Sequence, residues 1–296
     1  MRKIKPMRRS LLFFLPFLLL QCRRQHVETI AVKGSDTELN LVLQLAEAYM
    51  EIEPGVSVSI TGGGSGVGIA ALINGKTDIA NSSREINKYE IGMAGNRHIH
   101  PESFVFAADA LAVIVHPSIQ LDSLHLSDLG KIYAGDITDW AQTGAGAGRI
   151  SLYGRQSNSG TFIYFREKVL HRDFSPDLKQ MNGTAQILEA VRNDPGAIGY
   201  VGLGYLTDLH GTLREGIRII RLSDGHGGPA VSPLEKSAVQ KGLYPLTRPL
   251  YQYTDGFPEG KLREFMEFEK TTAAESIIEK NGYLLPRDAG LAASIR

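Results

Sequence analysis

The sequence has only one cysteine, Cys22, among its 296 residues, which excludes an internal disulfide and a cysteine-based zinc cluster. It also lacks an excess of either charge, because 32 acidic residues balance its 32 basic ones. A protein that binds nucleic acid usually carries a clear basic excess, so we expect no nucleic-acid partner. Internal repeats and low-complexity tails are absent as well. What is left is an ordinary globular composition, with 43% hydrophobic residues.

The apolar run near the N-terminus, Leu11 to Leu20, has only ten residues. Ten residues are too few to span a bilayer as a helix, but they suit the core of a signal peptide. Residues 1–21 contain five basic side chains and no acidic ones. We therefore predict that residues 1–21 are a signal peptide. Its removal leaves 27 basic against 32 acidic residues, a net charge of −5.

Cys22 follows this region directly, in the segment Leu-Leu-Gln-Cys. The segment resembles a bacterial lipobox, in which the cysteine is lipidated and becomes the mature N-terminus, although Gln21 stands where Gly, Ala or Ser is preferred. The alternative is an ordinary export signal followed by an incidental cysteine. We expect lipidation of Cys22, and hence an exported, membrane-anchored lipoprotein that faces the periplasm or the cell exterior.

Short strand-like runs alternate with amphipathic helical patterns along the rest of the chain. Residues 56–60 alternate between apolar and polar side chains, which is typical of a half-buried strand. Residues 39–50 repeat apolar side chains at the helical spacing, and residues 197–201 indicate another strand. Strands that alternate with helices over this length predict an α/β protein with largely parallel sheets.

Three segments, 34–37, 62–66 and 155–161, share one pattern: a strand, then glycine and hydroxyl residues, then the start of a helix. A helix start offers unpaired N–H groups and the positive end of the helix dipole, which together favour an anion. Arg155 adds a planar cation that matches a tetrahedral oxyanion. Each turn alone is explained by helix capping, but three in one chain favour an anion-binding site.

Motifs of catalytic proteins match poorly. The segment 66–71 fits a dinucleotide-binding pattern only formally, and His98 and His100 supply only two metal ligands. A phosphomonoester hydrolase that uses the same turns is the enzyme alternative, but it needs a nucleophile with a base, or a set of metal ligands. We therefore expect a protein without catalytic residues, without a metal and without a cofactor.

Taken together, the segments 34–37, 62–66, 78–84 and 159–161 resemble the phosphate-binding proteins of bacterial phosphate ABC transporters. Secondary signatures at 131–140, 197–201 and 244–251 agree, and the resemblance runs in order from about residue 30 to 282. It implies an α/β, two-lobed periplasmic-binding-protein fold, with two crossing hinge strands and a ligand cleft between the lobes. Lobe I would combine residues 27–107 with 246–296, and lobe II would span residues 108–245.

The resemblance also implies which residues bind phosphate, with Glu38 and Gly160 acting through their backbone N–H groups: Ser35, Thr37, Glu38, Ser65, Ser83, Arg155, Ser159, Gly160 and Thr161. Ser83 stands where some relatives carry an aspartate that accepts the proton of hydrogen phosphate. A serine hydroxyl can donate or accept, so other tetrahedral oxyanions stay possible ligands. Asp36 could take over the acceptor role, or it could simply cap the following helix.

The expected function is that of a monomeric, exported binding protein, which captures inorganic phosphate and delivers it to the permease subunits of an ABC transporter. A phosphate sensor or adhesin lipoprotein with the same fold is the alternative without a transport partner. The expected partners are thus phosphate, the permease and, through the lipid anchor, the membrane.

The first testable prediction concerns Cys22. If the cysteine carries the anchor, Cys22→Ser should release the protein from membranes into a soluble, exported fraction, because the variant has no site for the lipid. Detergent phase partitioning of both proteins checks this. A variant that still follows lipoproteins into the detergent phase would contradict lipidation at this residue.

Overall fold

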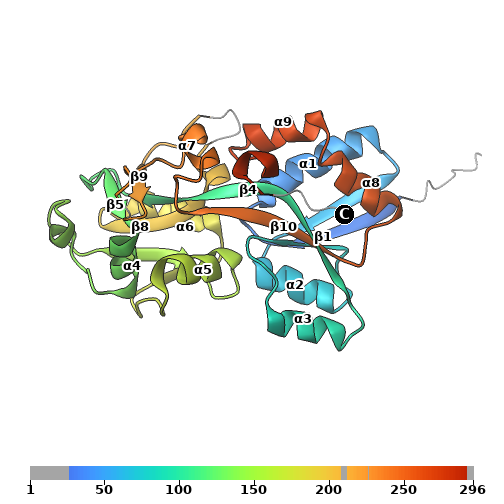
Figure 1. Ribbon diagram of the computed structural model, residues 1–296, viewed down its shortest axis with the longest axis horizontal. Helices are drawn as coiled ribbons and strands as arrows, with labels where there is room; N and C mark the ends of the chain where they lie inside the picture. Colours follow the sequence, from blue (N-terminus) through green and yellow to red (C-terminus); the bar gives the residue numbers. More distant parts are fainter. Residues whose placement is uncertain (1–26, 208–211, 226, 292–296) are drawn as a thin grey trace, which may run out of the picture.

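The computed structural model describes residues 27–207, 212–225 and 227–291. The predicted signal peptide, residues 1–21, and the predicted lipidation site, Cys22, lie outside the described residues. Among the residues that are described, no helix is long and apolar enough to cross a membrane. Two groups of strands and helices lie next to each other along the long axis of the molecule (Figure 1).

The N-terminal part of the chain and one returning strand build the first sheet. Its strands and helices are β1 Glu28–Gly34, α1 Leu39–Ile52, β2 Val56–Thr61, α2 Ser65–Ile73, β3 Ile79–Ser82, α3 Lys88–Gly95, β4 Pro101–Val115 and β10 Thr247–Asp255. The strand order is β2-β1-β3-β10-β4. β1 pairs in parallel with β2 and β3, whereas β10 pairs antiparallel with β3 and β4.

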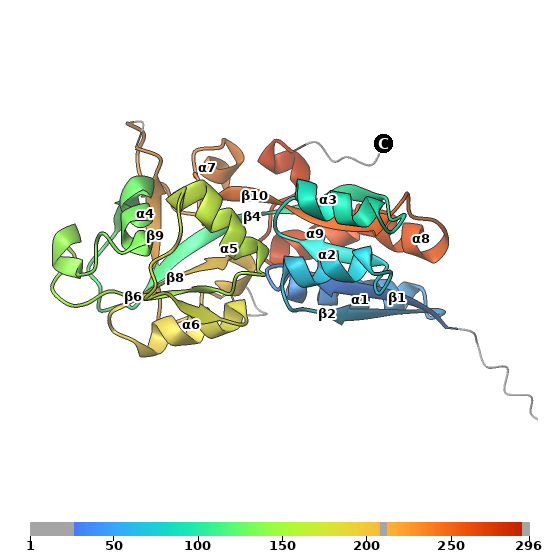
Figure 2. The ribbon, with the colours of Figure 1, turned by 90° about the horizontal axis from the view of Figure 1, so that it is seen from below.

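β4 belongs to both sheets. Its residues from Pro101 to Ala110 pair with β10, and Leu111–Val115 pair with β8 of the second sheet (Ala197–Gly202). Residues 107–115 are completely buried, which fits a strand covered on both faces. Both views show β4 and β10 running side by side across the middle of the molecule (Figures 1 and 2).

The middle of the chain builds the second sheet, in which β8 lies between β4 and β6, and β6 pairs with β7. Its other elements are β5 Ser123–His125, α4 Leu126–Ala134, β6 Ser151–Arg155, α5 Gly160–Phe165, β7 Lys179–Met181, α6 Thr184–Asn193, β9 Arg218–Ser223 and α7 Lys236–Gln240. A π-helical turn, Arg166–Leu170, extends α5. β9 pairs with the end of β4 and with β5.

Each sheet has its own hydrophobic core. The core of the first sheet includes Leu41, Leu45 and Phe265, and the core of the second includes Phe165 and Tyr200. The last helices, α8 Gly260–Phe268 and α9 Thr272–Lys280, return to the first group and contact α1. The first lobe is therefore built from segments at both ends of the described chain.

The predicted α/β class is confirmed, but the predicted largely parallel sheets are wrong. Both sheets are mixed, because β4 pairs antiparallel with β10, β8 and β9. The physical reason is that β4 and β10 carry the chain across the molecule in opposite directions and meet as neighbours. An apolar run in the sequence does not indicate whether the strand pairs parallel or antiparallel with its neighbour, since a buried strand is apolar in both cases.

The second prediction concerns Gly68, where α2 packs against the end of β1. A Cβ atom here would clash with the Lys33 backbone oxygen and lie 2.6 Å from the Gly34 Cα. Gly68→Ala should therefore lower the free energy of unfolding by about 1–3 kcal/mol. Gly92→Ala is the matched control, since its Cβ would meet nothing within 4 Å in α3, and it should stabilise by about 0.5–1 kcal/mol. Urea denaturation compares them, and equal effects would contradict the close packing.

Candidate functional site

The first predicted turn lies between β1 and α1. Ser35 and Thr37 are both buried, and the Ser35 Oγ accepts the N–H of Thr37 at 3.2 Å. The N–H of Ser35 donates to the Asn81 carbonyl oxygen at 2.9 Å, which ties this turn to the end of β3. The local sequence thus places two hydroxyl side chains at the carboxyl end of a parallel strand, a usual position for ligand-binding residues.

The second predicted turn leads into α2, and it lies beside the residue that follows β3. The N–H of Ser83 donates to the Ser65 Oγ at 3.1 Å, and the two hydroxyl oxygens are 3.4 Å apart. Ser65 is the first residue of α2 and is completely buried, as is Ser83. The structure therefore brings these two predicted residues together.

The third predicted turn comes from the other lobe, between β6 and α5. Ser159 caps α5, because its Oγ accepts the N–H of Thr161 at 3.2 Å. A Cβ atom on Gly160 would clash with the Ser65 Oγ and lie 2.7 Å from the Ser83 Oγ. Glycine is thus required for the N-terminus of α5 to approach the serines of the first lobe this closely.

Hydroxyl groups from the two lobes meet at the centre of the site. The Thr37 and Thr161 Oγ1 atoms are 2.8 Å apart, and the Thr37 Oγ1 lies 3.5 Å from the Ser83 Oγ. The N-termini of α2 and α5 lie at the same place, through Ser65 and Gly160. Small hydroxyls and two helix N-termini can bind a compact anion through several hydrogen bonds.

Arg155 is buried, but its guanidinium is largely committed to protein groups. It donates to the Asp36 Oδ2 at 2.5 Å, to the Asn182 carbonyl at 3.1 Å and to the Thr184 Oγ1 at 2.9 Å, while its Nε donates to Gln156. Four of the five guanidinium N–H groups therefore have partners. The fifth N–H has no partner in the described part of the chain and leaves one bond for a ligand, whereas a two-bond contact requires that a present partner be released.

Asp36 does not cap α1, so the capping interpretation of this residue is wrong. The N-cap residue of α1 is Glu38, which makes no side-chain cap hydrogen bond. The Asp36 carboxylate instead pairs with Arg155 of the other lobe and accepts the N–H of Gly63 at 3.0 Å. Its carboxylate oxygens thus bind two distant segments instead of the N–H groups at the start of α1. The role of Asp36 as a proton acceptor stays a prediction.

Sequence reasoning missed two charged residues at the centre of the site, Arg248 and Asp109. They form a buried ion pair at 2.9 Å, with 1% and 0% of their side chains exposed. The Arg248 Nη2 also donates to the Oγ1 atoms of Thr37 and Thr161, at 3.3 and 3.1 Å. The available signal was a single aspartate inside the apolar run of β4, because a charge there needs a buried partner.

The side chain of Glu38 is a second unexpected feature, since the prediction used only its backbone. Glu38 is completely buried, and neither carboxylate oxygen has a hydrogen-bond partner among the described residues. Burial raises the pKa of Glu38 to about 8, although the nearby Ser35 hydroxyl and the Arg248 guanidinium lower it in part. Burial therefore favours the neutral form of Glu38, which places no unpaired negative charge beside the site.

The sequence of the chain also matches the model of a known protein family. A family model described as a PBP superfamily domain matches residues 23–269. The chain belongs to the PBP superfamily. Within the described part of the chain, no group of three or more His, Cys, Asp or Glu residues could hold a metal ion.

Individual relatives agree with the family. The chain is 29% identical to the phosphate-binding protein PstS of Pseudomonas aeruginosa, over 85% of this chain and 81% of the relative. It is 28% identical to the PstS of Borreliella burgdorferi, over 90% of this chain and 94% of the relative. Among solved structures, an ABC-type phosphate transport receptor from Vibrio cholerae is 25% identical with a TM-score of 0.68, and the match covers 87% of this chain and all of the receptor.

A further solved structure supports the fold alone. A putative phosphate ABC transporter substrate-binding protein from Clostridium perfringens, solved with bound phosphate, is 23% identical with a TM-score of 0.75. The match covers 87% of this chain and 99% of that protein. The two-lobed fold expected from the sequence is therefore confirmed.

The third prediction concerns the Arg248–Asp109 pair. Arg248→Met leaves a buried carboxylate without its partner and should lower the free energy of unfolding by about 3–5 kcal/mol. Arg248→Met combined with Asp109→Leu should recover part of this loss, because no unpaired charge is then buried. Arg263→Met breaks an exposed pair with Glu267 and should cost less than about 1 kcal/mol. Urea denaturation measures all three, and a wild-type value for Arg248→Met would contradict the importance of the pair.

Proposed function

We propose that the protein is an extracytoplasmic substrate-binding protein, which captures inorganic phosphate between its lobes and delivers it to an ABC permease. The observation that carries the proposal is the meeting of hydroxyls and helix N-termini from both lobes around Thr37 and Thr161. Relatives at 28–29% identity carry the name phosphate-binding protein, which supports phosphate as the ligand.

Phosphate would be held by many short, charge-assisted hydrogen bonds rather than by one strong contact. The proposed donors are the hydroxyls and N–H groups of the predicted set, together with the Arg155 N–H that has no partner among the described residues: Ser35, Thr37, Glu38, Ser65, Ser83, Ser159, Gly160 and Thr161. Each such bond contributes about 1.5–3 kcal/mol, so about eight to ten cover a micromolar affinity after the costs of closure. The hydroxyl contact between Thr37 and Thr161 opens to admit the ion.

Phosphate differs from sulfate by a proton that needs an acceptor. We propose Asp36 for this role, because its carboxylate is held at the site by Arg155 and Gly63 and comes from the turn between β1 and α1. Sulfate brings no proton, so its charge would be repelled by the same carboxylate. This arrangement favours phosphate even though position 83 is a serine.

The lobes are proposed to open and close about the two crossing strands. Lobe I would comprise residues 27–107 and 246–296, and lobe II residues 108–245. The packing supports a division at this place, since Ala107 belongs to the first core and Ala108 to the second. On the returning strand, Leu250 belongs to the first core, whereas Leu246, just before this strand, still packs with the second.

The cellular setting follows from the sequence pattern. We propose an exported monomer that is anchored to the membrane by lipid on Cys22 and meets the permease there. The relatives are named as binding proteins, which favours binding over phosphomonoester hydrolysis.

Calorimetric titration tests the proposal and supplies the fourth prediction. Phosphate should bind one site with a Kd near or below about a micromolar, arsenate similarly, and sulfate and molybdate more weakly. Arg155→Ala should lower the phosphate affinity by ~30-fold or more, and Arg155→Lys should restore only part of this, because a lysine has one nitrogen instead of the planar fork that reaches several partners at once.

The matched control is Arg149→Ala, because Arg149 pairs with Asp177 on an exposed surface. It should bind phosphate like the wild type. A wild-type protein that releases no heat with phosphate, or that prefers sulfate, would overturn phosphate as the ligand. An unchanged affinity in Arg155→Ala would remove only this residue from the site.

A further inference from the structure

The carboxyl group of Glu38 is buried at the start of α1, and neither of its oxygens has a hydrogen-bond partner among the described residues. Glu38 is 0% exposed, so the group does not reach the surface of the molecule. Buried polar groups in folded proteins nearly always have a partner, and one without a partner beside a binding site needs an explanation. The phosphate site proposed above uses only the backbone N–H of this residue, so its side chain is left without a role.

Ser35 connects Glu38 to the inter-lobe site. The Ser35 hydroxyl lies near the Glu38 carboxyl and lowers its pKa, and among the effects that oppose burial it is the largest. The Ser35 Oγ also accepts the N–H of Thr37 at 3.2 Å. A hydroxyl has one proton to donate and two lone pairs that accept, so Ser35 can give its proton to Glu38 or to an anion, but not to both.

The protonation state of Glu38 decides between these two arrangements. An ionised carboxylate only accepts hydrogen bonds, so it takes the Ser35 proton, and its charge repels an anion. A neutral carboxylic acid has a proton of its own, which it can donate to the second lone pair of the Ser35 Oγ. The Ser35 proton is then available for the anion. The neutral form of Glu38 thus favours anion binding in two ways, through one additional donor and one fewer negative charge.

The other charged and titratable groups around Glu38 come from distant segments. Arg248 on β10 lowers the pKa of Glu38 and Asp109 on β4 raises it, and these two side chains are paired with each other at 2.9 Å. Tyr205, which follows β8, and Tyr283, which follows α9, also interact with Glu38 electrostatically. Burial raises the pKa of both phenols above their ordinary range, so they stay neutral at the pH values, near about 8, at which Glu38 changes its charge.

We propose that Glu38 is a positioning residue of the phosphate site, which directs the Ser35 hydroxyl toward the ion when it is protonated and withdraws it when it is ionised. This inference rests on the proposed phosphate-binding function. It implies that phosphate binding takes up a proton from the solvent onto Glu38 wherever this group is ionised in the empty protein. The role proposed for Asp36 is separate, because Asp36 accepts the proton that the ion itself carries.

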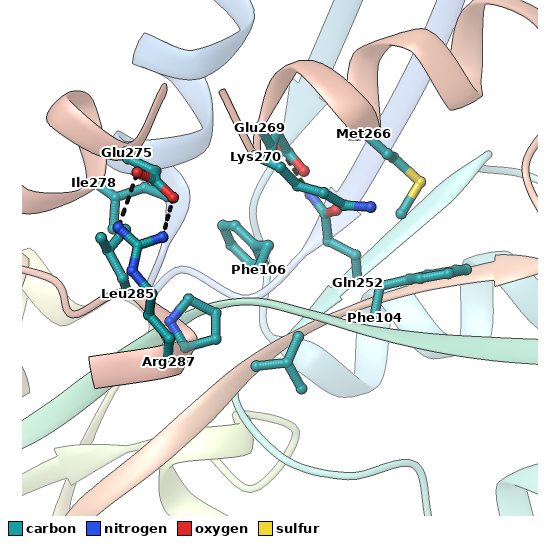
Figure 3. Close-up of a pocket in the computed structure, with 12 residues that line it drawn as sticks. Phe104, Phe106, Gln252, Met266, Glu269, Lys270, Glu275, Ile278, Leu285 and Arg287 are labelled. Carbon is teal, nitrogen blue, oxygen red and sulfur yellow. Dashed lines mark hydrogen bonds and ion pairs between the residues drawn. The ribbon is translucent and has the colours of Figure 1, made fainter. Parts of the chain in front are cut away.

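A second buried glutamate, Glu269, provides a comparison within the same protein. Burial raises the pKa of Glu269 to about 8 as well, but its Oε1 accepts the Gln252 Nε2 at 3.0 Å. Glu269 lines a separate cavity of about 370 Å³, whose wall includes Phe104, Phe106 and Met266, and none of the predicted phosphate-binding residues lines it (Figure 3). A change at Glu269 therefore removes the same kind of buried carboxyl without altering the inter-lobe site.

The experiment, which is the fifth prediction, titrates phosphate into the full mature protein by calorimetry between about pH 6.5 and 9.5. The ratio of wild-type to Glu38→Gln affinity should fall as the pH rises above about 8, by up to about tenfold per unit, because the amide does not ionise and can still donate to Ser35. Taking the ratio at each pH cancels the changing charge of phosphate itself. In two buffers of different ionisation enthalpy near about pH 8.5, the wild type should take up more protons for each phosphate bound than the variant.

Three further variants make the test specific. Glu269→Gln should keep the wild-type pH profile, because its carboxyl group lies outside the inter-lobe site. In a Ser35→Ala background, Glu38→Gln should have a smaller effect at high pH, since the hydroxyl that connects Glu38 to the ion is missing. Circular dichroism confirms that each variant is folded. If Glu38→Gln does not fold, Glu38→Met takes its place, because its side chain does not ionise either.

The outcomes separate this inference from the proposed function. A wild-type protein that binds no phosphate overturns both. Phosphate binding with the same pH profile in wild type and in the folded Glu38 variant overturns the role of Glu38 and leaves the proposed function standing. An equal change of the profile in Glu269→Gln also overturns it, because the effect then does not depend on a contact with the site.

Discussion

The buried ion pair between Arg248 and Asp109 joins the two strands that cross between the lobes, and the arrangement of the site depends on it. Two charges are removed from water only at a large cost unless each is paired and hydrogen-bonded. Here Asp109 also accepts the N–H of Leu203, and Arg248 donates to Thr37 of one lobe and Thr161 of the other. One guanidinium thus holds hydroxyls from both lobes at a common point.

Several polar groups of the inter-lobe site satisfy one another in this structure. Thr37 contacts Thr161, and Asp36 pairs with Arg155, as buried polar groups must find partners. An anion exchanges these bonds for charge-assisted ones, so the free energy of binding is a difference between two sets of bonds rather than the sum of the new ones. Selectivity among oxyanions then depends on which protein bonds each ion can replace.

Two buried carboxylates show how tertiary burial changes the chemistry of ordinary residues. Burial raises the pKa values of Glu38 and Glu269 to about 8, because each has too few donors to stabilise its charge. Nothing nearby in the sequence distinguishes them from exposed glutamates that begin or end a helix. Whether such a side chain faces water or a cavity depends on which segment packs over it, and that segment is distant in the chain.

The sequence by itself determined part of the secondary structure, such as the helix at 39–50, the strands at 56–60 and 197–201 and the hydroxyl-rich turns, because these depend on side chains a few residues apart. The capping of α5 by Ser159 is an example. Only the tertiary structure decided which charges pair: Asp109 and Arg248 are 139 residues apart, and Asp36 and Arg155 are 119 apart. It also decided that apolar side chains from strands and C-terminal helices enclose Glu269. Contacts over such separations follow from how the chain crosses and returns, which local patterns do not encode.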